Sequence, residues 1–265
     1  MGYSQEMSIV ADQMAAWLRE HVAAANAKGI VVGLSGGVDS AVVARVAQMA
    51  MGDAVIGIIM PAHSDPQDEQ DARLVAERFR LSVVVVDLTG TYDHLAGSIE
   101  QALGNHLNGG VAEADPPPKL ALANLKPRMR MTTVYAIANR FNYLVAGTGN
   151  RSEIEIGYYT KYGDGGVDLL PLGALVKSDV RALARELDVP TGIIEKAPSA
   201  GLWLGQTDEG EMGFTYADLE RFLSEGPAAV APAVAAKIDA LARGSAHKRR
   251  MPPVFEPVRS TPPRG

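Results

Sequence analysis

Residues 30–40 read IVVGLSGGVDS, and this stretch decides the fold class. Its first five residues form a continuous apolar run, which is typical of a parallel strand covered on both faces. A glycine turn follows, and residues 38–51 have the pattern of a helix that Gly52 would cap. Residues 35–37 leave backbone amides open at the amino end of that helix, where the helix dipole favours an anion. The stretch therefore predicts a strand, a phosphate-binding loop and a helix in succession.

Strand and helix patterns alternate on both sides of this unit, starting with an amphipathic helix over residues 4–27. The alternation predicts one α/β domain over residues 1–265, with a Rossmann-like, doubly wound parallel sheet that has helices on both faces. Within the helical pattern that ends at Phe141, Pro127 predicts a break or kink. The further strands are expected at residues 54–60, 81–87 and 143–146, and the further helices at residues 67–79, 92–107, 178–187, 216–223 and 228–241.

The composition excludes several classes of protein. The 265 residues carry a formal net charge of -6, which argues against a nucleic-acid binder because phosphate contacts need a basic surface. No cysteine is present, so disulfides, thiolate metal sites and a cysteine nucleophile are excluded. No apolar run approaches the roughly 18 to 20 residues that a membrane helix needs. We therefore expect a cytoplasmic protein with no membrane contact.

The loop between the first strand and its helix favours one kind of phosphate chemistry. Ser35 and Ser40 can add hydroxyl donors to an anion site, and Asp39 offers a carboxylate to Mg²⁺. The stretch matches neither GxxxxGKS/T nor GxGxxG, so a γ-phosphate-transferring ATPase and a dehydrogenase-type dinucleotide fold are both disfavoured. SGGVDS resembles the pyrophosphate loop (PP-loop) of the ATP pyrophosphatase superfamily, whose members cleave ATP between its α- and β-phosphates. The competing interpretation is an ordinary strand-to-helix glycine turn.

Further segments resemble the ammonia-dependent NAD synthetases, in that family's order along the chain. The resemblance implies an adenine nucleotide alpha-hydrolase-like fold and a ligase that joins ammonia to the carboxylate of deamido-NAD⁺ through an adenylated intermediate, with ATP giving AMP and pyrophosphate. Amide formation from a carboxylate needs a better leaving group than oxide, and AMP supplies one. The segments are NLKPRMRM (124–131), VAGTGNRSE (145–153), GYYTKYGDGGVDLLPLG (157–173), KAPSAGLW (196–203), GQTDEGEMG (205–213) and HKRR (247–250).

The resemblance also implies which residues form the site. Asp39 and Glu153 match the family's Mg²⁺-binding acids, and catalytic roles are implied for Asp39, Lys177 and Asp168. Without the resemblance, Glu153 would be interpreted as a solvated loop acid and Lys177 as a surface lysine beside a helix. The residues implied to bind ATP are Gly33, Leu34, Ser35, Gly36, Gly37, Val38, Asp39, Ser40, Thr148, Lys177 and Ser199, and those implied to bind deamido-NAD⁺ are Arg128, Lys161, Asp168, His247 and Lys248.

The sequence leaves the role of Asp168 open. Its carboxylate could bind a ribose hydroxyl, the cationic ring or ammonium, or take a proton from ammonium, and Asp164 in the same loop is a competing candidate. The chain departs from the family pattern at two positions. Gly201 stands where some members carry an acid, and Pro127 stands where an alanine is expected.

The resemblance also bears on partners. A fused glutaminase would need a much longer chain and, usually, a cysteine nucleophile, so we expect the use of free ammonia, or of ammonia from a separate glutaminase chain. The family implies a homodimer. Met7, Met14 and Trp17 share one face of the first helix, which suits an interface or, more commonly, the core.

Residues 199–213 are predicted to form a mobile lid, because their glycines can act as hinges and a closed lid would protect an acyl-adenylate from water. Residues 108–118 are expected to be a loop and residues 258–265 a flexible tail. Two other functions share part of the pattern. One is a different PP-loop adenylating amidotransferase or tRNA-modifying ligase, which for tRNA should be more basic, and the other is a non-catalytic nucleotide-binding protein.

Overall fold

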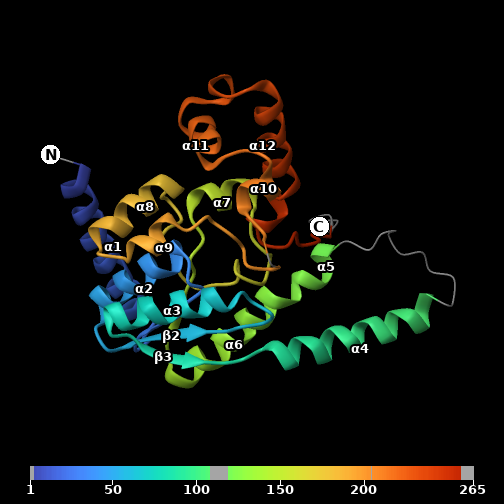
Figure 1. Cartoon of the computed structure of the whole chain (residues 1–265), viewed down its shortest axis with the longest axis horizontal. Coiled ribbons are helices and arrows are strands. Elements are labelled where there is room, and N and C mark those ends of the chain that lie inside the picture. The colour runs from blue at the N-terminus through green and yellow to red at the C-terminus, as the bar shows by residue number, and fades with distance from the viewer. Residues whose placement is uncertain (1–2, 108–118, 204, 258–265) are drawn as a thin grey trace, which may run out of the picture.

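The computed structural model describes residues 3–107, 119–203 and 205–257, and its centre is a four-stranded parallel sheet in the order β3-β2-β1-β4 (Figure 1). The predicted α/β class and the doubly wound, Rossmann-like arrangement are confirmed. From β1 the chain builds outward to β3 and then returns to place β4 on the other side of β1. The carboxyl ends of β1 and β4 therefore meet at a switch point, where open α/β sheets bind ligands. The strands are β1 (Ile30–Gly33), β2 (Val55–Ile59), β3 (Ser82–Val85) and β4 (Leu144–Ala146).

Helices cover both faces of the sheet because neighbouring strand residues point into two different cores. Ile30 and Val32 lie in the larger core, whereas Val31 lies in the smaller one. Met7 and Met14 are buried in the larger core, so the core interpretation of the first helix is confirmed for them. The larger core is covered by α1 (Tyr3–Ala24), α2 (Val38–Met51), α3 (Pro66–Phe79), α8 (Lys177–Glu186) and α9 (Thr191–Glu195), and the smaller one by α6 (Leu125–Phe141), beside which α4 (Thr89–Leu107) packs.

One local expectation needs correction. The break expected at Pro127 lies earlier, at Asn124, between α5 (Lys119–Ala123) and α6, and Pro127 sits in the first turn of α6, where a missing N–H costs nothing. After β4 comes a short helix, α7 (Arg151–Ile156), which Asn150 starts with a capping box. The expected loop 108–118 and tail 258–265 lie outside the described residues.

A smaller cluster of helices stands above the carboxyl edge of the sheet (Figure 1). It contains α10 (Asp208–Met212), α11 (Tyr216–Glu225) and α12 (Pro232–Gly244), which share an apolar core with Ile156 of α7. The helix expected at residues 228–241 begins later, because Pro232 occupies its first turn. No helix in the described part of the chain is long and apolar enough to cross a membrane. The arrangement encloses the switch point between the sheet below and the helical cluster above.

Candidate active site

The loop after β1 lies at the amino end of α2, and two of the three amides expected to be open are hydrogen-bonded within it: the amide of Ser35 donates to Oγ of Ser40 and that of Gly37 to Oγ of Ser35, both at 3.3 Å. Gly37 is the N-cap residue and supplies no side-chain cap, so the amides of the first turn remain available to an anion. Gly36 has a φ of 77°, and a Cβ there would lie 2.4 Å from the carbonyl oxygen of Asp68, so only glycine fits. The hydroxyl of Ser40 donates to the carbonyl oxygen of Gly37 at 2.9 Å and thereby closes the loop from within. The loop is thus an anion-binding turn already formed in the free protein.

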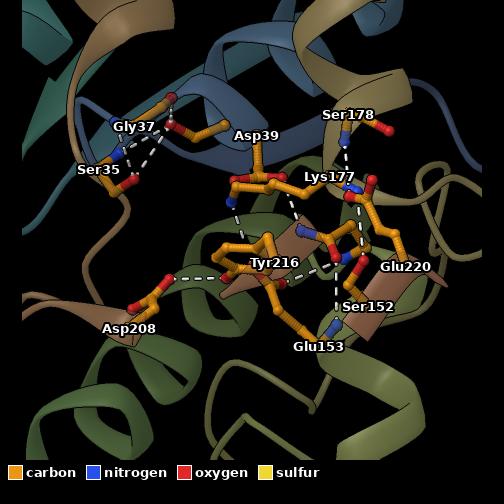
Figure 2. A network of polar contacts seen from close by, with 12 residues as sticks. Ser35, Gly37, Asp39, Ser152, Glu153, Lys177, Ser178, Asp208, Tyr216 and Glu220 are labelled. Atoms are coloured by element: carbon orange, nitrogen blue, oxygen red, sulfur yellow. Dashed lines mark hydrogen bonds and ion pairs between the residues drawn. The ribbon is translucent and has the colours of Figure 1, made fainter. Parts of the chain in front are cut away.

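Two acids and one lysine meet beside this loop, and we call them the acid–lysine cluster: Asp39, Glu153 and Lys177 (Figure 2). Lys177, the first residue of α8, is 3% exposed; its Nζ pairs with Asp39 and lies 3.3 Å from Oε1 of Glu153. The amide of Asn150 donates to Asp39 at 3.0 Å while its oxygen caps α7 at Glu153. Segments that follow β1 and β4 therefore meet at one point, as the sequence predicts for Asp39, Glu153 and Lys177.

The electrostatics of the acid–lysine cluster favour an additional cation. Burial raises the pKa of Glu153 to about 7, and Lys177 offsets only part of this while Asp39 adds to it. Burial alone would lower the pKa of Lys177, but the neighbouring Asp39 and Glu153 raise it overall, so the lysine stays charged. Two carboxylates share one ammonium here, so negative charge exceeds positive charge when both acids are ionised. A bound cation would relieve this imbalance.

Asp39 and Glu153 suit Mg²⁺ better than a metal held by protein ligands alone. Within the described residues, no group of three or more His, Cys, Asp or Glu side chains has an arrangement that could hold a metal ion. Mg²⁺ is usually held by one or two carboxylates together with substrate phosphates and water, and two carboxylates beside a phosphate loop match that pattern. The residues present therefore fit a magnesium ion that arrives with a nucleotide.

Sequence reasoning assigned no role to two further residues of this site, Asp208 and Tyr216. Oδ2 of Asp208 accepts a hydrogen bond from the hydroxyl of Tyr216 at 2.8 Å, and its Oδ1 is buried with no hydrogen-bond partner in the described structure. Burial raises the pKa of Asp208, and Tyr216 and Lys177 oppose this. Asp208 belongs to the GQTDEGEMG segment, so the family signature marked the position without its role.

A cavity of about 530 Å³ extends from the acid–lysine cluster across the carboxyl edge of the sheet. Thr148, Lys177 and Ser199 line it, as expected for ATP contacts, together with part of the phosphate loop. Gly36 and Ser40 of the loop are absent from the lining formed by the described residues, and so is Asp168. The other predicted site residues on the cavity wall are Gly33, Leu34, Ser35, Gly37, Val38, Asp39, Glu153, Arg128, Lys161, His247 and Lys248.

The far side of the cavity carries the cations expected to bind deamido-NAD⁺. Nζ of Lys161 donates to the carbonyl oxygen of His247 at 2.9 Å, and Nζ of Lys248 donates to the carbonyl oxygens of Gly157 at 2.7 Å and Tyr159 at 2.6 Å. These contacts join the loop after α7 to the 3-10 turn Ala246–Lys248 near the end of the described chain. The structure thus brings together basic residues that are 86 or more positions apart in the sequence.

The structure separates the two candidate acids of the loop. Asp168 lies outside the cavity lining and accepts hydrogen bonds from Tyr135 at 2.9 Å and from the amide of Val145 at 2.8 Å. Asp164 lies on the cavity wall and accepts one from the amide of Thr160 at 2.9 Å. Asp164 is therefore better placed to meet a small cation, while Asp168 ties β4 to α6.

The segment expected to form a lid is held in place on both sides. The carbonyl oxygen of Leu202 accepts a hydrogen bond from buried Lys126 at 2.7 Å, and Nζ of Lys196 pairs with Asp68 at 2.8 Å and with Asp71. Gly201 has a φ of 61°, and a Cβ there would lie 3.7 Å from a carboxylate oxygen of Asp68. An acid at this position would face Asp68, which gives a physical reason for glycine here.

Comparisons with known proteins agree with this geometry. Residues 10–252 match the family model for NAD synthase. An NH(3)-dependent NAD(+) synthetase of Carboxydothermus hydrogenoformans is 52% identical over 245 residues, which cover 92% of this chain and 95% of the relative.

Solved structures show the same likeness in three dimensions. An NMN synthetase from Francisella tularensis is 35% identical, with a TM-score of 0.84 and coverage of 95% of this chain and 98% of that one. An NH3-dependent NAD synthetase from Campylobacter jejuni in complex with nitrate is 26% identical, with a TM-score of 0.75 and coverage of 97% and 100%. Sequence and structure together assign this chain to the NAD synthase family.

Proposed function

We propose that the chain adenylates the carboxylate of deamido-NAD⁺ with ATP and then admits ammonia, all within the one cavity. As a member of its family the chain is an ATP-using ligase that forms a C–N bond and makes NAD⁺. The observation that carries the adenylation step is the position of Lys177. Its ammonium lies between Asp39 and Glu153 beside the open amides of α2, where charge develops as pyrophosphate departs.

In this proposal each part of the cavity has one task. The amides at the amino end of α2 and the ammonium of Lys177 hold the β- and γ-phosphates as a leaving group. Asp39 and Glu153 hold Mg²⁺, which when bound neutralises phosphate charge. Arg128, Lys161 and Lys248 line the far wall, where cations suit the diphosphate and the carboxylate of deamido-NAD⁺.

Ammonia is proposed to enter as the free molecule or from a separate glutaminase chain. Asp164, on the cavity wall, is the better candidate to receive ammonium, because the carboxylate oxygens of Asp168 already accept hydrogen bonds from Tyr135 and Val145. We expect NAD⁺ formation with ammonium chloride and none with glutamine alone. Efficient use of glutamine by the purified chain would refute this part.

The test of the proposed reaction follows its products. Purified protein is incubated with ATP, Mg²⁺, ammonium and deamido-NAD⁺, and NAD⁺, AMP and pyrophosphate are measured together. We expect the three products in equal amounts. ADP and orthophosphate in their place would overturn the adenylation mechanism.

One comparison favours nicotinate mononucleotide as a second candidate substrate. The solved structure with the TM-score of 0.84 is described as an NMN synthetase, and amidation of nicotinate mononucleotide would use the same phosphate loop and acid–lysine cluster. The two substrates differ by the adenylate half of the dinucleotide. A competition assay with both at equal concentration decides the preference, and we expect deamido-NAD⁺ to be used first because the 52% identical relative is an NAD(+) synthetase.

We also propose a homodimer, formed at the β3 edge of the sheet. Large apolar side chains are exposed on β3 and on α4, the helix that follows it, which indicates a covered surface. Light scattering of the purified protein should give twice the chain mass, and a charged substitution at Val85 should halve it. The exposed residues are Val84 and Val85 of β3 and Leu95 and Leu103 of α4.

A further inference from the structure

Tyr216 contacts three charged groups on the phosphate side of the cavity, namely Asp208, Glu153 and Lys177 (Figure 2). It is buried as the first residue of α11, and its hydroxyl lies 2.8 Å from Oδ2 of Asp208 and 3.4 Å from Oε1 of Glu153. The centre of its ring lies 5.2 Å from Nζ of Lys177, within the range of a cation–π contact. A tyrosine that served only to fill the core would not need both contacts.

The phenol of Tyr216 donates the hydrogen bond at 2.8 Å to Asp208, and the hydroxyl of Tyr158 is a second phenol that acts on the same carboxyl group. Oδ1 is buried and has no hydrogen-bond partner among the described residues, and Oδ2 has Tyr216. A buried carboxylate without donors is unfavourable, so it turns toward the nearest positive charge. For Asp208 that charge is the ammonium of Lys177, which already acts on it electrostatically.

The ammonium of Lys177 can pair with only a limited number of carboxylates while it remains directed at the phosphate loop. At present its ammonium pairs with Asp39 and Glu153, which lie on the switch-point side. Asp208 belongs to the lid segment itself, where its backbone amide donates to the carbonyl oxygen of Pro198 at 3.0 Å. A third carboxylate acting on Lys177 from there would draw the ammonium away from the leaving phosphates.

We propose that Tyr216 is a positioning residue, which holds Asp208 by its hydroxyl and so keeps Lys177 paired with Asp39 and Glu153. The proposal rests on the proposed function, because Lys177 is taken to stabilise departing pyrophosphate. The backbone amide of Tyr216 donates to Oε1 of Glu209 at 2.9 Å, which ties α11 to α10. The position of the lid segment is thereby connected to the position of the catalytic ammonium.

The first experiment replaces Tyr216 by phenylalanine in the full-length protein. Tyr216→Phe keeps the ring beside Lys177 and removes the hydroxyl, which donates to Asp208 at 2.8 Å and lies 3.4 Å from Glu153. We expect kcat for pyrophosphate release to fall by at least tenfold, the loss typical of a hydrogen bond to a charged group, while KM for deamido-NAD⁺ stays within about twofold. The Mg²⁺ concentration for half-maximal activity should rise about threefold or more, because a displaced ammonium disturbs Asp39 and Glu153.

The second experiment tests the cause by rescue. If Asp208 competes for Lys177 once the phenol is gone, then removing its charge in the same molecule should restore activity. The double variant Tyr216→Phe with Asp208→Asn is therefore expected to recover at least half of the lost kcat on a logarithmic scale. A tyrosine with a purely structural role would instead give losses that add.

A matched control removes the same atom elsewhere. Tyr143→Phe deletes a phenol hydroxyl from a tyrosine beside the smaller core, outside the cavity, and should leave kcat and the Mg²⁺ response unchanged. Thermal unfolding of each variant separates loss of fold from loss of position. Wild-type kcat in Tyr216→Phe, an equal rise of every KM, or a double variant slower than Tyr216→Phe would each overturn the proposal. Absence of activity in the wild type would instead refute the proposed function itself.

Discussion

The two sides of the cavity hold their cations in different ways. On the phosphate side Lys177 is buried and pairs with two carboxylates. On the dinucleotide side Lys161 and Lys248 donate to backbone carbonyls, and neither takes part in an ion pair among the described residues. A carbonyl is neutral, so a lysine held by it keeps its charge for an anion, whereas a lysine between acids is balanced until ligands arrive. The ammonium group on the phosphate side is therefore positioned by ion pairs, and those on the dinucleotide side are positioned by hydrogen bonds to backbone carbonyls.

Removal of Lys177 should give the largest effect. Lys177→Met leaves Asp39 and Glu153 without their shared counter-charge and the leaving phosphates without an ammonium. We expect kcat to fall by about 10²–10³-fold, the loss typical for one group that stabilises transition-state charge, measured as pyrophosphate release at saturating substrates. Lys28→Met removes an exposed charge from the opposite edge of the sheet and serves as the control. A loss below about tenfold would show that the phosphate side does not depend on this charge.

A change on the dinucleotide side should alter binding and leave chemistry alone. Lys248→Met removes a charge that forms no ion pair among the described residues, together with its hydrogen bonds to the carbonyl oxygens of Gly157 and Tyr159. KM for deamido-NAD⁺ should rise by about 10–100-fold, the range of one hydrogen bond to a charged group, while KM for ATP and kcat stay within about threefold. Steady-state kinetics with each substrate varied in turn measure this. Equal effects on both KM values would remove the distinction between the two sides.

The two sides should also differ in their response to pH. Burial raises the pKa of Glu153 from 4.5 to about 7, so its charged form, which Mg²⁺ needs, is lost as the pH falls through about 7. With a non-hydrolysable ATP analogue present, Mg²⁺ should bind about tenfold more weakly at pH 6 than at pH 8, as measured by calorimetry. Because the native state binds this proton more tightly than the unfolded state, Glu153 makes the protein less stable as the pH rises from about 4.5 to about 7.

A variant without this acid gives the control for the pH experiment. Glu153→Gln should remove most of the difference between pH 6 and pH 8, since glutamine does not titrate there. KM for deamido-NAD⁺ in the wild type should change less over the same range, because Glu153 lies on the phosphate side of the cavity. A pH-independent Mg²⁺ affinity in the wild type would mean that Glu153 does not contact the ion.

On the phosphate side, the sequence predicted those features that depend on residues close together along the chain. The loop after β1, the helix α2 and its cap at Gly52 depend on residues within about one turn of each other, and these predictions are confirmed. Asn150 escaped notice because its contact with Asp39 spans 111 positions. Its role as the cap of α7 carried a sequence signal, since asparagine followed three residues later by glutamate predicts a capping box.

The roles of other residues depend on contacts that no local pattern indicates. Sequence reasoning placed Asp168 with the substrate ligands, whereas the structure shows it bound to Tyr135 and Val145, and the family pattern alone does not show this. Tyr216 looked like the first residue of an amphipathic helix. Only the packing of α11 against α7 and α10 shows that its hydroxyl faces two carboxylates. Fold class follows from periodicity, but the partners of a buried polar atom follow from tertiary structure.

Lys196 is an intermediate case, and it gives the smallest predicted effect. Like Lys177 it pairs with two acids, Asp68 and Asp71, but its side chain is 29% exposed, so water screens both pairs. Lys196→Gln leaves two acids near the phosphate loop, and we expect KM for ATP to rise about two- to fivefold with kcat within about twofold. Lys196→Arg, which keeps the charge, is the matched variant and should retain the wild-type KM. If Lys196→Gln instead lowered kcat as far as Lys177→Met, burial would not explain why the two lysines differ in their effect on catalysis. Pairing with two carboxylates would then be enough to identify a catalytic ammonium.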